Sequence, residues 1–247
     1  MRALTHITGQ SAPDYALRVP GHLQLLTAAG ILAGLVGAGL LLGAPALPMV
    51  VGLVLLAAGI VGLTFAVAIG VITSPRLRTR ARHQMLDSFT WRGDEHVLDV
   101  GCGNGFLLNE IAKQLTTGHA TGIDLWKTEA GTQAAETAWR NARLEGVADR
   151  VDIKNADART MPFGDGEFDV VVSSLMLHHA GGSVDRERVL SEMLRVLKPG
   201  GALMLYDVAP LIGGAARSLR ARGTEAIEQS GRVMALLSVR RPVAAQL

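Results

Sequence analysis

The sequence predicts an α/β fold with a doubly wound, mostly parallel sheet, preceded by a two-helix transmembrane hairpin. Two observations predict this architecture. Short apolar runs alternate with helical segments after residue 75, and no Asp, Glu, Lys or Arg occurs over the 57 residues Val19–Pro75. The 247-residue chain is 49% hydrophobic with a mean hydropathy of +0.28, which excludes a disordered chain and allows an ample core.

Charge and cysteine usage exclude several function classes. The net charge is only +2 and no polybasic tract with interleaved aromatics occurs, so we expect no nucleic-acid partner. Cys102 is the single cysteine, which excludes a disulfide framework and a cysteine-rich zinc site. We therefore expect no metal centre.

The uncharged block divides into two candidate spans at a turn near Gly43–Pro48, where a glycine and two prolines interrupt any helix. The spans cover about residues 23–42 and 49–72, and each is long enough for a bilayer, which needs about 20 apolar residues. Small residues recur at helical spacing in both spans and predict close helix packing; they are Gly30, Gly34 and Ala38, and Gly62, Ala66 and Gly70.

Arginines flank the spans and predict their orientation. Arg2 and Arg18 precede the first span, Arg76–Arg82 holds four more after the second, and the turn has none. The positive-inside tendency then predicts a multi-pass membrane protein with both ends cytoplasmic. The chain would comprise a cytoplasmic tail (1–18), the hairpin (19–75) and a catalytic domain (76–247). Two alternatives are a signal peptide cleaved after Ala44–Ala46 and a buried hairpin of a soluble protein.

The remaining elements follow from apolar periodicity and breakers. A helix near 77–86 ends before Arg92–Asp94, and a buried strand at 96–100 enters a glycine cluster. Later apolar runs predict strands at 120–125, 151–155, 168–175 and 202–206. Helices are predicted at 105–115, 132–145, 185–197 and 210–222, and a terminal strand pair at 224–228 and 232–241, turning at Ser230-Gly231.

A glycine-rich loop follows the first strand in Asp99-Val-Gly-Cys-Gly-Asn-Gly105. Its glycines allow a tight turn and close approach of the backbone to a bulky ligand. The dinucleotide fingerprint would need glycine where Phe106 stands, which disfavours a nicotinamide oxidoreductase. A purely structural strand-to-helix turn is the other interpretation.

Five ordered motifs resemble those of class I S-adenosylmethionine-dependent methyltransferases. They are Val97–Gly105, Thr121–Asp124, Asn155–Ala158, Met161–Asp169 and Arg195–Gly201. The resemblance covers about residues 78–241 and implies a Rossmann-like, seven-stranded sheet with S-adenosylmethionine as cofactor.

The resemblance also implies the cofactor-binding residues. Asp124 would accept hydrogen bonds from the ribose hydroxyls, Asp157 would face the adenine amino group, and Asp99 would support the loop and the methionine amine. A helix cap for Asp124 and a turn-forming role for Asp157 are the structural alternatives. The complete set is Asp99, Gly101, Cys102, Gly103, Gly105, Asp124, Leu125, Asp157, Ala158 and Ser174. For Cys102 we expect a small packed side chain.

Methyl transfer needs a base only when the acceptor must lose a proton. His178 and His179 follow the fourth strand, where the resembled family shapes its substrate pocket, and are the candidate catalytic residues. Tyr206 and Asp207 end the fifth strand and are further candidates. A structural role, with the rings hydrogen-bonded to backbone, is the competing interpretation.

We therefore expect a membrane-anchored methyltransferase with a small, lipophilic acceptor, such as a quinone precursor, a lipid or an apolar metabolite. A hairpin anchor would hold the site near substrates dissolved in the bilayer. The alternatives are a membrane-tethered S-adenosylmethionine-binding protein without turnover and a methyltransferase of a water-soluble metabolite. The spans could also pair two copies into a homo-oligomer.

Overall fold

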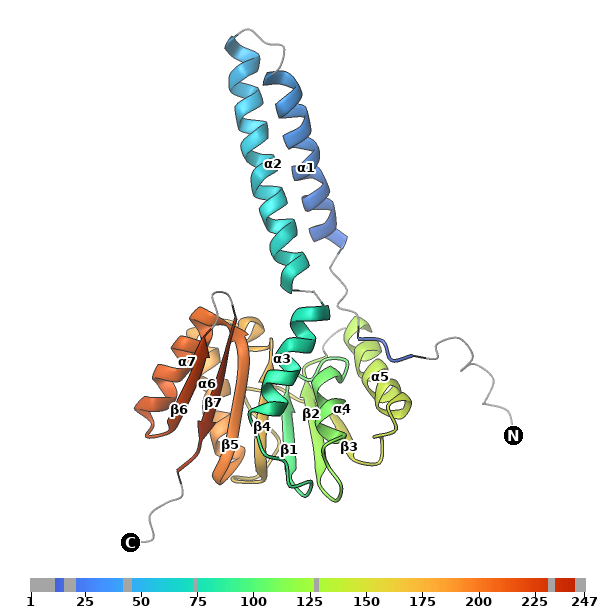
Figure 1. Ribbon diagram of the computed structural model, residues 1–247, viewed down its shortest axis with the longest axis vertical. Helices are drawn as coiled ribbons and strands as arrows, with labels where there is room; N and C mark the ends of the chain where they lie inside the picture. The colour runs from blue at the N-terminus through green and yellow to red at the C-terminus, as the bar shows by residue number, and fades with distance from the viewer. Residues whose placement is uncertain are drawn as a thin grey trace, which may run out of the picture. The chain divides into compact units, whose positions relative to one another are not determined.

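The chain forms two compact units. A computed structural model describes residues 12–15, 21–41, 46–72, 75–126, 129–230 and 234–242 (Figure 1). One unit is helical and covers Ala16–Arg80. The other is α/β and combines Met1–Tyr15 with Ala81–Leu247.

The α/β unit contains the predicted seven-stranded, mostly parallel sheet, in the order β3-β2-β1-β4-β5-β7-β6 (Figure 1). The first five strands in this order run parallel, whereas β7 pairs antiparallel with both β5 and β6. The strands are β1 (His96–Val100), β2 (His119–Asp124), β3 (Val151–Asn155), β4 (Phe168–Ser174), β5 (Leu197–Val208), β6 (Glu225–Ser230) and β7 (Met234–Arg240).

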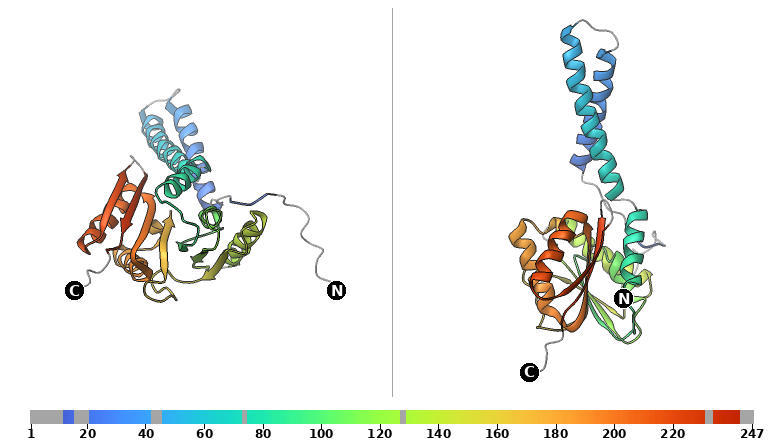
Figure 2. Two further views of the ribbon diagram at one scale, coloured as in Figure 1. Left: turned by 60° about the horizontal axis from the view of Figure 1, so that its bottom comes forward. Right: turned by 60° about the vertical axis from the view of Figure 1, so that its left-hand side comes forward.

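Helices cover both faces of this sheet, as a doubly wound fold requires. Figure 2 shows α4 (Phe106–Ala112) and α5 (Glu129–Leu144) on one face. On the other lie α6 (Ser183–Val196) and α7 (Ala209–Ala221). The single-turn 3₁₀ helix η1 (Leu177–His179) follows β4, and α3 (Pro75–Asp87) precedes β1. Apolar residues of the central strands, such as Leu98, Val171 and Leu203, are fully buried between the layers.

Several element bounds differ from the prediction. The fifth strand begins at Leu197 instead of residue 202, because Leu197 already pairs with Phe168 before an irregularity in the register. Helix α5 begins three residues early, and α4 ends at Ala112. The terminal strand pair is confirmed by β6 and β7, while Gly231 of its predicted turn lies outside the described residues.

The helical unit is a pair of packed helices, α1 (Gly21–Leu41) and α2 (Ala46–Ile72). Helix α2 begins before Pro48 because proline is tolerated in a first turn, where its N–H would have no partner. Glycines form the contact, as predicted, but the partner row differs. A Cβ added to Gly59 would lie 2.3 Å from Cα of Gly34, and one on Gly62 would lie 2.9 Å from Cα of Gly30. Gly59, absent from the predicted row, therefore makes one of the closest approaches.

The outer surface of this helix pair is apolar. Leu25 and Val61 are 72% and 69% exposed, and large aliphatic side chains surround them on both helices. One helix in the described part of the chain is long and apolar enough to cross a membrane, with a window at Val50–Val67 of mean hydropathy 2.6; Gln24–Ala38 is a shorter apolar segment. The second predicted span is thus not confirmed.

A buried carboxylate fixes the turn that leads into β1. Glu95 is fully buried and accepts the main-chain N–H groups of Arg92 at 2.7 Å and Gly93 at 2.9 Å. The carbonyl of Gly93 in turn accepts the N–H groups of Thr116, Thr117 and Gly118. This turn therefore joins the start of β1 to the segment before β2.

Replacing Glu95 with leucine should lower the free energy of unfolding by about 2–4 kcal/mol, because two N–H donors lose a charged acceptor. Denaturant unfolding followed by tryptophan fluorescence would measure the loss, since Trp91 lies beside this turn and donates to the carbonyl of Leu86. The matched control is Asp94→Ala, whose side chain is 61% exposed and should change stability by under about 0.5 kcal/mol. Equal stability of both variants would contradict the assigned role.

Candidate cofactor-binding and methyl-transfer site

The candidate site lies where the strand order of the sheet reverses. Strand β1 pairs with β2 along one edge and with β4 along its other edge, so the chain moves in opposite directions through the sheet on either side of β1. In open α/β sheets, ligands bind beyond the carboxyl ends of the strands at such a point. The ends of β1, β2, β4 and β5 bring the loop 101–105, Asp124, Ser174 and Asp207 to this edge.

The loop 101–105 turns sharply over the end of β2. Gly101, Gly103 and Gly105 have φ angles of 81°, 55° and 81°, a region that side chains disfavour. The N–H groups of Gly101 and Cys102 both donate to the carbonyl of Ile123, at 2.8 and 3.0 Å. Gly105 then donates to the carbonyl of Cys102 and leads into α4. The backbone requires all three glycines.

Two of these glycines differ in their surroundings. A Cβ on Gly101 would lie 2.4 Å from Cγ of Met176, so this position is closed by packing. A Cβ on Gly103 would meet no atom within 4 Å. Open space beside Gly103 leaves room for a ligand against the loop backbone.

Asp124 ends β2 and is hydrogen-bonded to this loop. Its Oδ2 accepts the N–H of Gly103 at 2.8 Å, and its Oδ1 accepts the N–H of Leu125 at 2.7 Å. Each carboxylate oxygen has a further lone pair. The carboxylate can therefore accept two more hydrogen bonds, as a ribose diol would require.

Asp99 is a buried carboxyl group next to the loop. Its side chain is 1% exposed, and its Oδ2 has no hydrogen-bond partner among the described residues. Burial, and secondly the negative charge of Asp124, raise the pKa of Asp99 to about 8. An unpartnered buried carboxyl oxygen is costly unless a ligand supplies a donor or a positive charge.

Asp157 and Ala158 lie just beyond β3, as predicted, but the Asp157 carboxylate is engaged. It accepts Nε and Nη2 of Arg159 at 3.0 and 2.7 Å, together with the main-chain N–H of Arg159 at 2.9 Å. Ala158 is half-buried against the apolar core. The structure thus adds an ion pair at the residue predicted to face adenine.

Ser174 is the last residue of β4, and the chain turns abruptly after it. Leu175 is the one residue other than glycine with a positive φ, 58°, in the described part of the chain. Its N–H donates to the carbonyl of Tyr206. This turn places Met176 against Gly101, which connects the segment before the histidines to the loop 101–105. A strained turn of this kind is common at functional sites.

His178 is paired with a buried carboxylate. Its Nδ1 lies 3.0 Å from Oδ1 of Asp207, which is 1% exposed, and its main-chain N–H donates to Oδ2 at 3.3 Å. If Nδ1 carries the proton, Nε2 is the basic atom. The His179 ring lies against His178 with ring centroids 3.9 Å apart and the planes tilted by 44°, and burial lowers the pKa of His179.

Cys102 packs beneath the loop, as predicted. Its side chain is buried, and burial together with the charges of Asp99 and Asp124 raises the pKa of the thiol. Such a thiol is a poor nucleophile because the thiolate is the reactive form.

The structure adds residues that sequence reasoning missed. Asp207 was a separate candidate base, and its pairing with His178 depends on the end of β5 meeting η1. Asn104, Asn109 and Asn141 hold the back of the loop against the segment 12–15. No motif indicated this contact, because the partners stand 90 or more positions apart.

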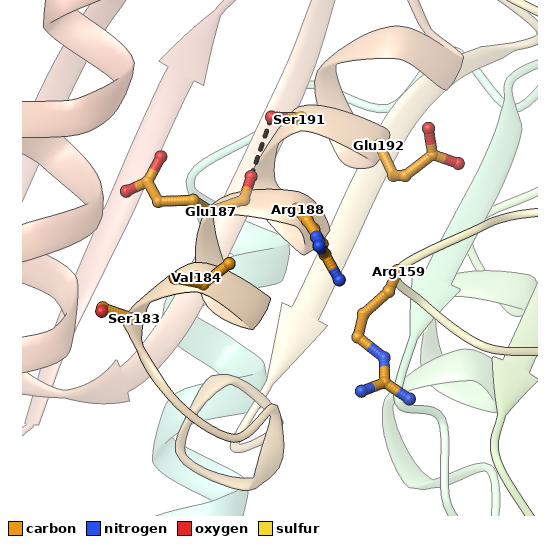
Figure 3. A pocket seen from close by; sticks show the side chains of 7 residues that line it. All are labelled: Arg159, Ser183, Val184, Glu187, Arg188, Ser191 and Glu192. Atoms are coloured by element: carbon orange, nitrogen blue, oxygen red, sulfur yellow. Dashed lines mark hydrogen bonds between the residues drawn. The ribbon is translucent and has the colours of Figure 1, made fainter.

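An open surface depression lies between α6 and Arg159. Figure 3 shows the charged and polar side chains that surround Val184 there, with a hydrogen bond from Ser191 Oγ to the carbonyl of Glu187. None of the predicted site residues lines it. Its lining residues are Arg159, Ser183, Val184, Glu187, Arg188, Ser191 and Glu192.

Comparisons with known proteins agree with this geometry. The family described as "Methyltransferase domain" matches residues 98–205. The 27-O-demethylrifamycin SV methyltransferase of Amycolatopsis mediterranei is 36% identical over 132 residues, which are 52% of this chain and 44% of that protein. A ubiquinone/menaquinone biosynthesis C-methyltransferase of Roseobacter denitrificans is 32% identical over 132 residues, 53% of this chain and 49% of the relative.

The match therefore spans about half the length of these curated relatives. Among solved structures, a SAM-dependent methyltransferase from Aquifex aeolicus has the same fold, with a TM-score of 0.54 and 20% identity; the alignment covers 64% of this chain and 88% of that one. Three features of the site fit S-adenosylmethionine: the unpartnered oxygen of Asp99, the open space at Gly103 and the carboxylate of Asp124. Residues 98–205 thus match the methyltransferase-domain family, and the α/β unit has the fold of a SAM-dependent methyltransferase.

Proposed function

We propose that the protein transfers the methyl group of S-adenosylmethionine to a small lipophilic acceptor at a membrane. The main support for the cofactor site is the buried carboxyl group of Asp99, which has one unpartnered oxygen beside the loop 101–105. This oxygen would accept from the methionine amine, and Asp124 from the ribose hydroxyls. When bound, S-adenosylmethionine supplies a methyl carbon activated by its own sulfonium.

The protein's task is then alignment and, for some acceptors, proton removal. In our proposal the backbone at Gly101 and Gly103 orients the methionine end, with Ser174 and Leu125 at its margins, and Asp157 with Ala158 borders the adenine. His178 would act as the base, because Asp207 orients its ring through Nδ1. His179 would pack against that ring and support its position.

The helical unit supports a membrane location. Its exposed surface is dominated by aliphatic side chains, and α2 contains a window of mean hydropathy 2.6. Contiguous apolar surface of this kind marks a membrane or protein contact. We infer that α1 and α2 together cross the bilayer as a hairpin, with the α/β unit on the cytoplasmic side. The similar proteins named for a rifamycin and for quinone biosynthesis favour a lipophilic acceptor.

Incubating the protein with labelled S-adenosylmethionine and membrane extract should yield a labelled lipophilic product, identified by mass spectrometry. The chain itself should remain with the membrane pellet after an alkaline carbonate wash.

Asp124→Ala should weaken cofactor binding by at least about tenfold, since two charge-assisted hydrogen bonds are lost. Titration calorimetry would measure this change.

The matched control is Asp152→Ala, an exposed carboxylate on β3 that pairs with Lys154 and should bind the cofactor normally. Label appearing only in water-soluble products would contradict the lipophilic acceptor. Tight cofactor binding with no labelled product from any extract would favour the tethered binding protein over the enzyme.

Cofactor affinity should rise with pH between 6 and 7, by up to about tenfold per unit. The pKa of Asp99 is raised to about 8, so the free protein holds this carboxyl protonated in that range. A cationic amine bound beside it favours the ionised form, so binding should release a proton. Calorimetry in buffers of different ionisation enthalpy would count that proton. Asp99→Asn should abolish the release, and an unchanged release in this variant would rule out Asp99 as its source.

His178→Ala should lower kcat by about 10²–10⁴-fold, the usual contribution of a positioned base. Its Kd for S-adenosylmethionine should stay within about twofold of the wild type, because the ring is not part of the proposed cofactor site. His179→Ala should lower kcat less, since only His178 is paired with Asp207, and His96→Ala, at an exposed position that begins β1, is the control that should match the wild type. Equal kcat values for His178→Ala and wild type would assign the histidine a structural role.

A further inference from the structure

The short segment 12–15 binds the back of the loop 101–105 through its main chain. The N–H of Asp14 donates to Oδ1 of Asn141 at 2.9 Å, and its carbonyl accepts Nδ2 of Asn141 at 2.8 Å. The Asn141 amide on α5 thus pairs with this backbone as a neighbouring strand would. Asn141 is fully buried, so each of these hydrogen bonds would be costly to lose.

The same contact reaches Asn104, the residue between Gly103 and Gly105. Nδ2 of Asn104 donates to the carbonyl of Asp14 at 3.1 Å, and the carbonyl of Asn104 accepts Nδ2 of Asn141 at 3.0 Å. Asn104 is therefore held at both its side chain and its backbone. Its two neighbours have positive φ angles. The contact thus acts on the part of the loop that faces open space.

Tyr15 holds the helix that follows the loop. Its hydroxyl donates to Oε1 of Glu145 at 3.0 Å and accepts Nδ2 of Asn109 at 2.9 Å. Its ring packs edge-on against Phe106, the first residue of α4, with centroids 5.0 Å apart. Burial, opposed by the Asn109 hydrogen bond, raises the pKa of Tyr15, so the phenol is neutral and remains a donor.

We propose that Asp14 and Tyr15 form a clasp that positions the loop 101–105 for S-adenosylmethionine, which makes them positioning residues of the methyl-transfer reaction. The inference rests on the proposed cofactor site. The clasp lies on the side of the loop occupied by Asn104 and α4, whereas Asp124 holds Gly103. With both in place, the loop is preorganised, and the cofactor need not order it on binding. If the clasp increases the affinity for the cofactor by some factor, then by linkage the bound cofactor must stabilise the clasp by that same factor.

The test uses the full chain in detergent micelles and compares Tyr15→Ala, Tyr15→Phe and a control, Ala12→Ser, at an exposed position of the same segment. Tyr15→Ala should raise the Kd and KM for S-adenosylmethionine by about tenfold while kcat changes less than about twofold, because the loop then orders on binding. Tyr15→Phe keeps the ring on Phe106 and should recover part of the affinity. Ala12→Ser should match the wild type.

Hydrogen exchange on the wild-type protein supplies a second readout that needs no variant. Saturating S-adenosylmethionine should slow exchange in the peptide containing Asp14 and Tyr15. The clasp proposal would be overturned by an unchanged Kd in Tyr15→Ala, or by a hydrogen-exchange rate in this peptide that is the same with and without the cofactor. A lowered melting temperature with unchanged Kd would assign Tyr15 a merely structural role. Failure of the wild type to bind S-adenosylmethionine at all would overturn the proposed function, and the clasp with it.

Discussion

The fold and the site both depend on one carbonyl group. Ile123, near the end of β2, accepts the N–H groups of two consecutive residues, Gly101 and Cys102. This double hydrogen bond bends the chain over the neighbouring strand as soon as β1 ends. Three positive φ angles follow within five residues, and α4 begins from a left-handed Gly105. The proposed contacts to the methionine and ribose parts of the cofactor are made by this bend and by Asp99 and Asp124 beside it.

The bend brings two carboxyl groups close enough to influence each other. Asp124 remains partly exposed and accepts two main-chain N–H groups, whereas Asp99 is buried and keeps one oxygen without a partner among the described residues. Burial raises the pKa of Asp99, so this carboxyl group resists ionisation in the absence of a nearby cation. A cofactor that carries an amine and a sulfonium is the kind of ligand that relieves this arrangement.

Local sequence predicted much of this structure because local chemistry determines it. The glycines, the buried runs of β1 and β4, and the acid at the end of β2 occupy the places their residue types require. The fifth strand was predicted, but its start at Leu197 was missed because Pro199 and two glycines usually end a strand, and the pairing of Leu197 with Phe168 overrides that preference. The His178–Asp207 pair and the contact of Asp14 with Asn141 depend on segments 29 and 127 positions apart. Such long-range contacts follow from the strand order of the sheet and from the packing of helices on it, and no single sequence motif encodes either.

The contact of residues 12–15 makes the α/β unit discontinuous in the chain. Tyr15 ends one of its segments and Ala81 begins the other, with the helical unit inserted between them. Phe106 contacts both segments, through the Tyr15 ring and through the guanidinium of Arg82, 5.0 Å from the ring centroid. Cutting the chain after the second helix would therefore remove a segment of the α/β unit together with the helix pair. A version without the helix pair is better obtained by joining Tyr15 to Ala81 through a flexible linker. Both contacts of Phe106 on α4, with Tyr15 and with Arg82, are then kept.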